Sequence, residues 1–282
     1  MSQSFSYWSI CLLCILCVGG RLFAGAWTPE QGRTYLKLST NDFESYANYN
    51  LDGDRFDPFG TFDDRFSRFQ DNNYNLYFET GLSSKLALLG SFTYKDIEQH
   101  TVAPGLDVRA ANQGFADVDL GVRYRLSDGP NVFSVGLLLK LPYLYDNDDN
   151  FFQLGNGQED LELRLLYGRS LGHGFYTGLE AGYRWRTDEP SDEYRYLAEL
   201  GWSKGRFYTR GKLSGIFAVD DFEPAGFGSP LLNPQYDLTT SELTVGLSFS
   251  KAWHGEYSFS ETLAGKNTAD GSNHLLAVVY TF

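Results

Sequence analysis

The chain has 282 residues, a formal net charge of −13 at pH 7, and 42% hydrophobic and 16% aromatic residues. This acidity argues against nucleic-acid binding, which requires a basic face. Beyond the first 26 residues no segment approaches the ~20 continuous apolar residues of a membrane helix. A membrane location would therefore require a β-barrel.

The N-terminus predicts export. Residues Trp8 to Val18 are almost all apolar, and small residues follow up to Ala26. This pattern is typical of a secretory signal peptide, so we expect residues 1–26 to be the signal, with cleavage after Ala24 or Ala26, and residues 27–282 to be the mature domain. All three cysteines lie in the signal. The mature domain therefore has no disulfide, thiolate metal site or cysteine nucleophile.

Apolar and polar residues alternate with a period of two in runs of about ten residues. Five short turns are expected, near Ser83, Ser127, Gly172, Ser203 and Lys251. Six longer connections alternate with them: Tyr46 to Arg68, Glu98 to Gln113, Asp146 to Gly157, Thr187 to Asp192, Asp220 to Asp237 and Gly265 to Ser272. This arrangement predicts an all-β fold, an antiparallel transmembrane β-barrel of about 12 strands with short periplasmic turns and long extracellular loops.

A soluble β-sandwich would alternate in the same way, with its apolar face inward. Three features favour the membrane barrel: aromatic residues near strand ends, strands longer than the usual ~5 to 6 residues, and alternation that continues to the last residue. Tyr280 and Phe282 end this last strand. They resemble the C-terminal signal read by the outer-membrane insertion machinery, so we expect them to be an assembly signal.

Four segments together resemble a known family. They are AWTPEQGRTYLKLS from Ala26, GFADVDLGVRYRL from Gly114, GNGQEDLELRLLYGRSL from Gly155 and GYRWRTDEPSDE from Gly182. They look like the outer-membrane barrels named for a phenol-degradation pathway. The resemblance implies a barrel of about twelve strands and a transport role for small, often hydrophobic, molecules. It brings no catalytic motif with it.

The charged residues on the polar faces of the middle strands are the candidate pore lining. They are Arg123, Arg125, Glu162, Arg164, Glu180, Arg184, Arg186, Arg195, Glu199, Arg206, Arg210 and Lys212. An arginine ladder facing carboxylates would set a transverse field that selects polar or anionic solutes. Alternatively, the same charges neutralise one another and fill a narrow lumen. The sequence leaves both interpretations open.

Other candidate sites are weak. The acidic segments Asn50 to Asp57 and Tyr145 to Asn150 offer oxygen ligands, but they lack the later glutamate of a calcium-binding loop, and we expect no metal. His173 and His254 fall in predicted turns, and no lipase motif is present. We therefore expect no enzyme and no cofactor.

The leading functional interpretation is a monomeric outer-membrane channel for passive passage of small molecules, hydrophobic or anionic. The alternatives are a plugged structural or adhesive barrel and, with less support, an outer-membrane enzyme. The expected partners are outer-membrane lipid and lipopolysaccharide, the barrel-insertion machinery and a small-molecule solute, with no nucleic acid.

Overall fold

The computed structural model describes residues 25–57, 61–62, 65–145, 154–187, 191–220 and 235–282. The predicted signal segment up to residue 24 lies outside them. Twelve long antiparallel strands form the barrel. They are β1 (Thr34–Tyr49), β5 (Arg68–Gly81), β6 (Leu86–Ala103), β7 (Leu106–Arg125), β8 (Asn131–Leu141), β9 (Asp160–Gly172), β10 (Phe175–Arg186), β11 (Glu193–Lys204), β12 (Phe207–Ala218), β13 (Asp237–Ser248), β14 (Trp253–Lys266) and β15 (Thr268–Thr281).

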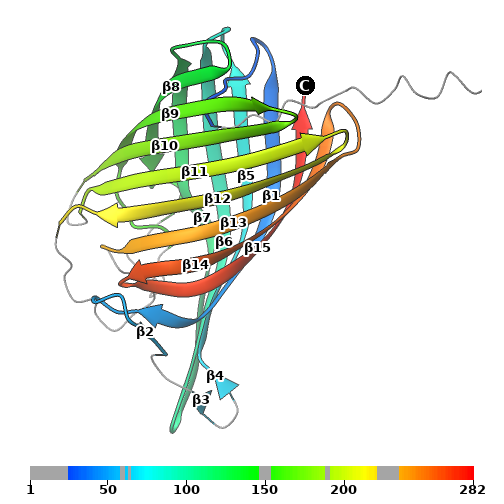
Figure 1. The fold of residues 1–282 in the computed structure, drawn as a ribbon. Helices are drawn as coiled ribbons and strands as arrows, with labels where there is room; N and C mark the ends of the chain where they lie inside the picture. The colour runs from blue at the N-terminus through cyan, green and yellow to red at the C-terminus, as the bar shows by residue number, and fades with distance from the viewer. Residues whose placement is uncertain (1–24, 58–60, 63–64, 146–153, 188–190, 221–234) are drawn as a thin grey trace, which may run out of the picture.

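Pairing of β15 with β1 closes the sheet, so the predicted fold class is confirmed. Each of the other long strands pairs with its neighbours in the chain, and the wall is continuous in Figure 1. At the closure, the Thr34 amide donates to the Phe282 carbonyl at 2.8 Å and the Phe282 amide donates to the Thr34 carbonyl at 3.0 Å. The last residue of the chain thus takes part in closing the barrel.

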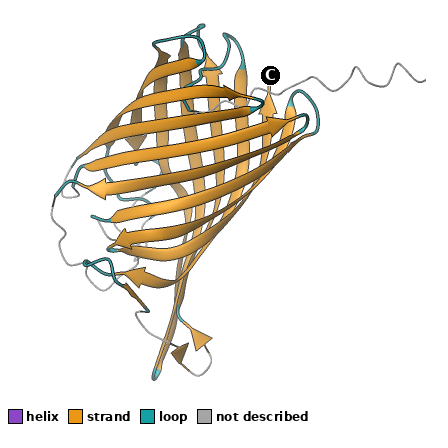
Figure 2. Ribbon diagram, in the orientation of Figure 1, coloured by secondary structure: helices purple, strands orange, loops and turns teal. Residues whose placement is uncertain are grey.

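The two ends of the barrel differ. The end at which the chain terminates, marked C in Figure 1, carries the short connections 82–85, 126–130, 173–174, 205–206 and 249–252, and we call it the turn end. The opposite end, the loop end, carries the remaining connections, with the short strands β2 (Arg55–Phe56), β3 (Thr61–Phe62) and β4 (Arg65–Phe66). Figure 2 shows only strands and loops among the described residues. No helix in the described part of the chain is long and apolar enough to cross a membrane.

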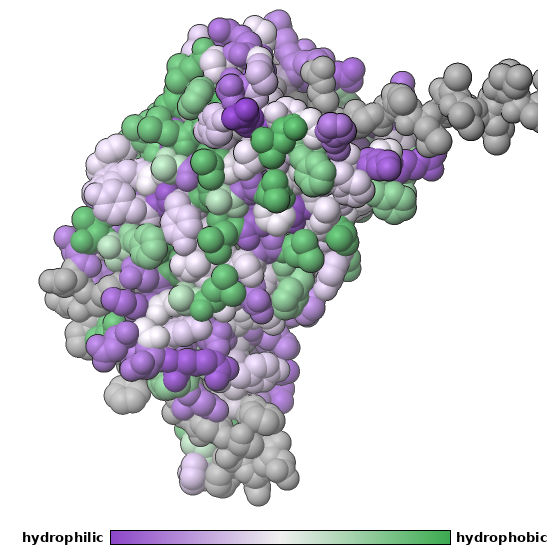
Figure 3. Space-filling model, viewed as in Figure 1, coloured by the Kyte–Doolittle hydropathy of each residue, from purple (hydrophilic) through white to green (hydrophobic). Residues whose placement is uncertain are grey.

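The alternation along the strands is turned inside out relative to a soluble protein. Leu165 and Leu179 point outward with 62% and 50% of their surface exposed, whereas Glu162 and Arg184 on the same strands are buried inside. Apolar side chains spread over the wall in Figure 3, and hydrophilic ones gather towards the ends. A closed sheet with an apolar exterior and a charged interior is the arrangement of a membrane barrel, because lipid can cover only apolar side chains at low cost.

Aromatic residues form a belt on the outside of the turn end. Neighbouring strands contribute the pairs Phe133–Tyr167, Phe175–Trp202 and Trp253–Tyr280, with ring centroids 5.0, 6.3 and 4.4 Å apart. Such rings suit the membrane–water interface, since they combine an apolar body with a polar edge. The predicted enrichment of aromatics at strand ends is therefore confirmed at this end.

Two of the six predicted long loops are wrong. In place of a loop over Glu98 to Gln113, β6 and β7 continue past the other strands as one hairpin that turns at Gly105, with φ of 72°. Gly265 to Ser272 likewise forms a hairpin, turning at Asn267 with φ of 53°. These segments carry few large apolar residues, so the alternation that identifies a strand is weak in them. The predicted loops Asp146 to Gly157 and Asp220 to Asp237 lie largely outside the described residues.

A β-bulge interrupts the pairing of β6 with β7 outside the segment Glu98 to Gln113. Phe92 pairs with Val118 and Tyr94 with Phe115, so two residues of β7 stand opposite Thr93. A bulge shifts the period of two by one residue. Phe115 therefore faces outward before the bulge, whereas Asp117 points into the barrel after it.

Candidate functional site

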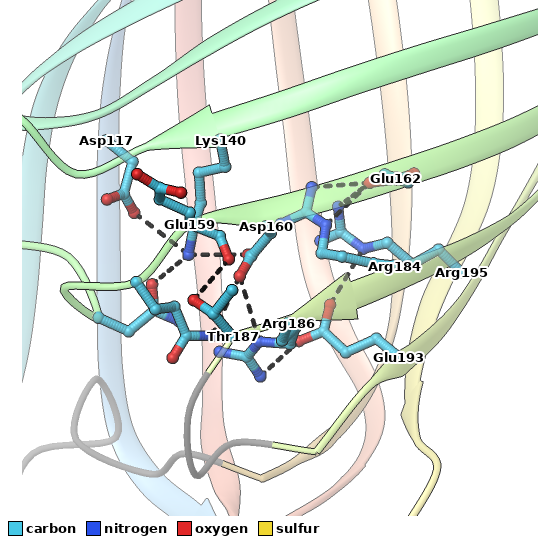
Figure 4. A network of polar contacts seen from close by, with 12 residues as sticks. Asp117, Lys140, Glu159, Asp160, Glu162, Arg184, Arg186, Thr187, Glu193 and Arg195 are labelled. Atoms are coloured by element: carbon cyan, nitrogen blue, oxygen red, sulfur yellow. Dashed lines mark hydrogen bonds and ion pairs between the residues drawn. The ribbon is translucent and has the colours of Figure 1, made fainter.

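Glu162 is the centre of a charged cluster inside the barrel. Its Oε2 lies 2.7 Å from Nη2 of Arg184 and 3.2 Å from Nη1 of Arg195, and its Oε1 accepts from Nε of Arg164. The Glu162 side chain is 1% exposed. The register places Glu162 directly opposite Arg184, and period-two spacing puts Arg164 on the same face. Three guanidinium groups thus surround one buried carboxylate, and Figure 4 shows two of them, those of Arg184 and Arg195, beside Glu162.

The network continues towards the loop end. Lys140 Nζ lies 2.8 Å from Asp160 and 3.8 Å from Asp117, the carboxylate that the bulge turns inward. Arg184 Nη1 lies 3.4 Å from Asp160, and this joins the two groups. Arg186 Nη1 lies 3.0 Å from Glu193 Oε1. These ion pairs, drawn in Figure 4, hold the loop-end rims of β8–β11 together.

A second buried carboxylate, Glu256, lies across the lumen. Its Oε2 is 2.8 Å from Lys37 Nζ and 3.0 Å from Arg210 Nη2, and its Oε1 accepts from the Tyr208 hydroxyl at 3.0 Å. Lys37 and Glu256 are 219 residues apart in sequence, and closure of the barrel brings them together. Lys212 with Glu242, at 3.0 Å, and Arg123 with Glu79 form further ion pairs inside the barrel.

Most of the predicted lumen residues face inward as expected. Glu180 lies 3.9 Å from Arg164, and Glu199 is buried. Arg125 lies at the rim of the turn end, 3.1 Å from Asp128. The inward position predicted for Arg206 is wrong: this residue is exposed in the turn before β12, which begins at Phe207.

The pairing decides between the two interpretations of the arginine ladder. The pairing involves five arginines, each of which contacts a carboxylate on its own strand or on a strand one or two positions away in the sheet: Arg123, Arg164, Arg184, Arg195 and Arg210. A charge buried inside a protein needs such a partner because it has lost its hydration. The geometry thus favours mutual neutralisation over a free basic surface.

The segment Gly25–Arg33, which the sequence did not predict to be part of the site, enters the lumen at the turn end. Ala26 is 1% exposed, and its carbonyl accepts from the Ser134 hydroxyl on β8 at 2.5 Å. The Trp27 ring lies 6.2 Å from Tyr176 of β10, edge to face, and packs against Gly168 of β9. We call this segment the N-terminal plug.

The plug crosses to the opposite wall. A Cβ at Gly81, the last residue of β5, would overlap the carbonyl oxygens of Pro29 and Glu30. The Gly32 amide donates to the Gly81 carbonyl at 2.8 Å. Glycine inside a strand often marks a close approach of another backbone or ring, so Gly81 and Gly168 were the available sequence signals.

The chain also enters the lumen at the loop end. Leu154 is buried against Phe69 and Ile97. Asn156 accepts from Lys140, and the Tyr145 hydroxyl, which donates to Asp117 at 2.5 Å, accepts from the Gly157 amide at 2.9 Å. Residues 154–158 thus line the lumen together with the strands.

Residues that the structure describes line three cavities inside the barrel. The loop-end cavity, of about 710 Å³, and the central cavity, of about 290 Å³, lie next to each other and share Arg195, Leu238 and Thr240 in their linings. The turn-end cavity, of about 340 Å³, is lined in part by Pro29 and Arg33 of the N-terminal plug.

His254 does not lie in a turn as predicted; it belongs to β14, is buried, and faces the lumen. Its Nδ1 lies 2.8 Å from the Ser248 hydroxyl. Among the described residues no carboxylate hydrogen-bonds this imidazole. The pair therefore lacks the orienting group that a serine nucleophile and its base normally require.

In the acidic loop Asn50 to Asp57, the Asn50 side chain is used within the loop. The Asn50 side-chain oxygen accepts from the amides of Asp52 and Asp54 at 2.9 and 2.8 Å. Within the part of the chain that the structure describes, no group of three histidine, cysteine or acidic residues could hold a metal ion. Part of the segment Tyr145 to Asn150 lies outside the described residues.

Known proteins resemble this chain in structure rather than in sequence. No family model and no curated protein matches it. The crystal structure of the COG4313 outer membrane channel from Pseudomonas putida F1 has a TM-score of 0.74 and 16% identity, covering 93% of this chain and 100% of that one. The KdgM porin (TM-score 0.52, 8% identity, 86% and 99% covered) and the NanC porin (0.53, 8%, 87% and 98%) are more distant. These structures are described as channels or porins, and at such identities the likeness shows the fold of the chain: a closed, twelve-stranded outer-membrane β-barrel.

Proposed function

We propose that this protein is a monomeric outer-membrane channel through which small molecules pass without energy input. One observation carries the proposal: two adjacent cavities, the loop-end and the central one, are lined by charged and polar side chains inside a barrel whose outer wall is apolar. Polar groups along an aqueous path can replace part of the hydration of a solute, and binding that is weak enough allows release. The similar barrels described as channels and porins agree with this role.

The N-terminal plug is the expected gate. It lies across the turn end from β8–β10 to β5, with Ala26 and Pro29 buried. A solute in the central cavity therefore leaves at the turn end only if the plug moves. The plug is held by the Ser134 hydrogen bond, by backbone hydrogen bonds to Gly81 and by packing of Trp27. None of these contacts belongs to the pairing between the long strands, so this movement does not require unfolding of the barrel.

The expected processing and location fit this role. Cleavage after Ala24 would leave Gly25 and Ala26 in the mature chain, where Ala26 makes its buried contact with Ser134. The barrel would be inserted by the outer-membrane machinery, with Tyr280 and Phe282 as its signal and the loop end facing outward towards lipopolysaccharide.

A reversible crosslink tests the channel and its gate together. The mature chain has no cysteine, so Ala26→Cys with Ser134→Cys would join the plug to β8. We expect conductance in planar bilayers from the wild-type protein, a marked loss in the oxidised double variant, and recovery on reduction. The Ser134→Cys single variant is the control and should not respond to the reductant.

Folding is checked by heat-modifiable gel migration, since a closed barrel resists detergent until heated. Absence of conductance from correctly folded wild-type and reduced protein would overturn the channel and favour the plugged structural barrel.

A further inference from the structure

The loop-end cavity has a wall of amides and hydroxyls. Asn273 on β15 donates to Asn41 on β1 at 3.3 Å, and Asn41 donates to Asn73 on β5 at 2.9 Å. Asn73 in turn donates to Asp71 at 3.1 Å. Asn75, also on β5, donates to Thr93 on β6 at 2.8 Å. A ladder of uncharged side chains thus runs across four neighbouring strands.

Hydroxyl groups extend this ladder to the adjoining strands. Ser260 and Thr262 of β14 and Thr240 of β13 line the same cavity. Thr240 also pairs with the Ser214 hydroxyl at 2.9 Å. Amides and hydroxyls both donate and accept hydrogen bonds. This wall can therefore satisfy groups of either kind on a solute.

The charges in the same cavity balance. Its lining includes four acidic residues and four basic residues: Asp71, Asp117, Asp119 and Glu261, with Lys95, Lys140, Arg184 and Arg195. Lys95 lies 3.3 Å from Asp71, and the other basic residues belong to the ion-pair network already described. A balanced lining offers little net attraction to either an anion or a cation.

The uncharged wall also has a binding capacity that the protein leaves unused. Oδ1 of Asn273 is buried and accepts no hydrogen bond among the described residues. A buried acceptor without a partner costs free energy, which a donor on a bound solute would recover. Beside the ladder, Phe43 and Tyr236 contribute aromatic rings to the lining. These rings can cover the C–H faces of a solute.

We propose that the loop-end cavity binds neutral polyhydroxylated solutes, the class of small saccharides and sugar alcohols. Closely spaced hydroxyls that both donate and accept match the ladder from Asn273 to Thr93. The volume of about 710 Å³ lies within the usual range of ~300 to 1,000 Å³ for ligand sites. This inference rests on the proposed channel function and names its solute class.

Other solute classes fit this wall less well. A hydrophobic solute would displace water from the amides and leave their hydrogen bonds unmade, which costs free energy for each group. An anion would need a free cation, and Arg184 and Arg195 already contact Glu162.

Maltose, glucuronate and toluene serve as neutral, anionic and apolar probes. Block of the single-channel current is titrated with each probe, added on the side of the loop end. We expect maltose to bind with the lowest Kd. Asn41→Leu should raise this Kd about threefold to tenfold, the effect of losing one or two hydrogen bonds.

Thr40→Leu is the matched control, because Thr40 is the neighbour of Asn41 on β1 but points out of the barrel. It should leave the Kd unchanged. Asn73→Leu is a second variant that tests the same ladder if Asn41→Leu does not fold. Tighter block by glucuronate or toluene, or an unchanged maltose Kd in a folded ladder variant, would overturn the solute class while the channel itself stands. Absence of any current in the wild-type protein would instead overturn the proposed function.

Discussion

The indole ring of Trp27 occupies the space above Gly168 into which any side chain at that position would project. Gly168 lies on β9 and faces the lumen, so this contact fixes the N-terminal plug against the wall. Residues Ala26, Val132 and Leu166 pack around the same ring. Close packing of Trp27 therefore helps to hold the plug, and a methyl group added at Gly168 would disturb this packing.

Gly168→Ala should release the plug. The added Cβ would overlap the Trp27 ring. We expect the plug to move rather than β9, because movement of β9 would break the hydrogen bonds that pair it with β8 and β10. We expect higher single-channel conductance and faster tryptic cleavage after Arg33, with unchanged heat-modifiable migration. Gly136→Ala is the matched control on β8, because its nearest neighbour is 3.6 Å away. Equal conductance of the two variants would contradict the gate.

Glu162→Gln should destabilise the folded barrel by about 3 to 5 kcal/mol, because it leaves three arginines around a neutral group in a buried site. Urea unfolding in detergent micelles measures this loss. Glu242→Gln is the comparison: its pair with Lys212 is about one-quarter exposed on each side, so its loss should cost less, about 1 kcal/mol or below. Similar losses in both variants would show that the cluster around Glu162 has no special role.

The mature protein should begin at Gly25. Ala26 accepts a buried hydrogen bond from Ser134, and Gly25 lies against the Glu180 carboxylate. Cleavage after Ala24 would place the new, positively charged amino group in the neighbourhood of Glu180, whereas cleavage after Ala26 would remove both residues. The intact mass of protein purified from outer membranes distinguishes the two. A mass that begins at Trp27 would contradict this prediction.

Phe282→Ala should slow assembly more than it destabilises the finished barrel. The Phe282 backbone closes the sheet against Thr34 in either form, and its ring, stacked on Tyr280 at 5.0 Å, is half exposed on the outside. Pulse-chase fractionation should show periplasmic accumulation, with little change in urea midpoint for the folded protein. Phe249→Ala removes a comparably exposed ring near the turn end and should assemble normally. Normal insertion of both variants would argue against the assembly signal.

Local patterns were sufficient for the architecture. Alternation such as that of Leu161, Leu163 and Leu165 around Glu162 and Arg164 predicted the strands, their inward and outward faces and the closed barrel, because period-two side-chain direction follows from strand geometry alone. It failed at Glu98 to Gln113, where the extended hairpin carries few large apolar residues. It also misplaced Arg206 and His254, since strand ends depend on pairing with neighbours.

The sequence by itself determined that charged side chains line the lumen; only the tertiary structure decided what those charges do. Whether Arg184 and Arg195 attract a solute or neutralise Glu162 depends on which atoms approach within about 3 Å, and this follows from register across several strands. The contact of Lys37 with Glu256 exists only because the barrel closes. The N-terminal plug has no periodic signal, because its position comes from the fit of Trp27 over Gly168, two residues that the chain brings together from 141 positions apart.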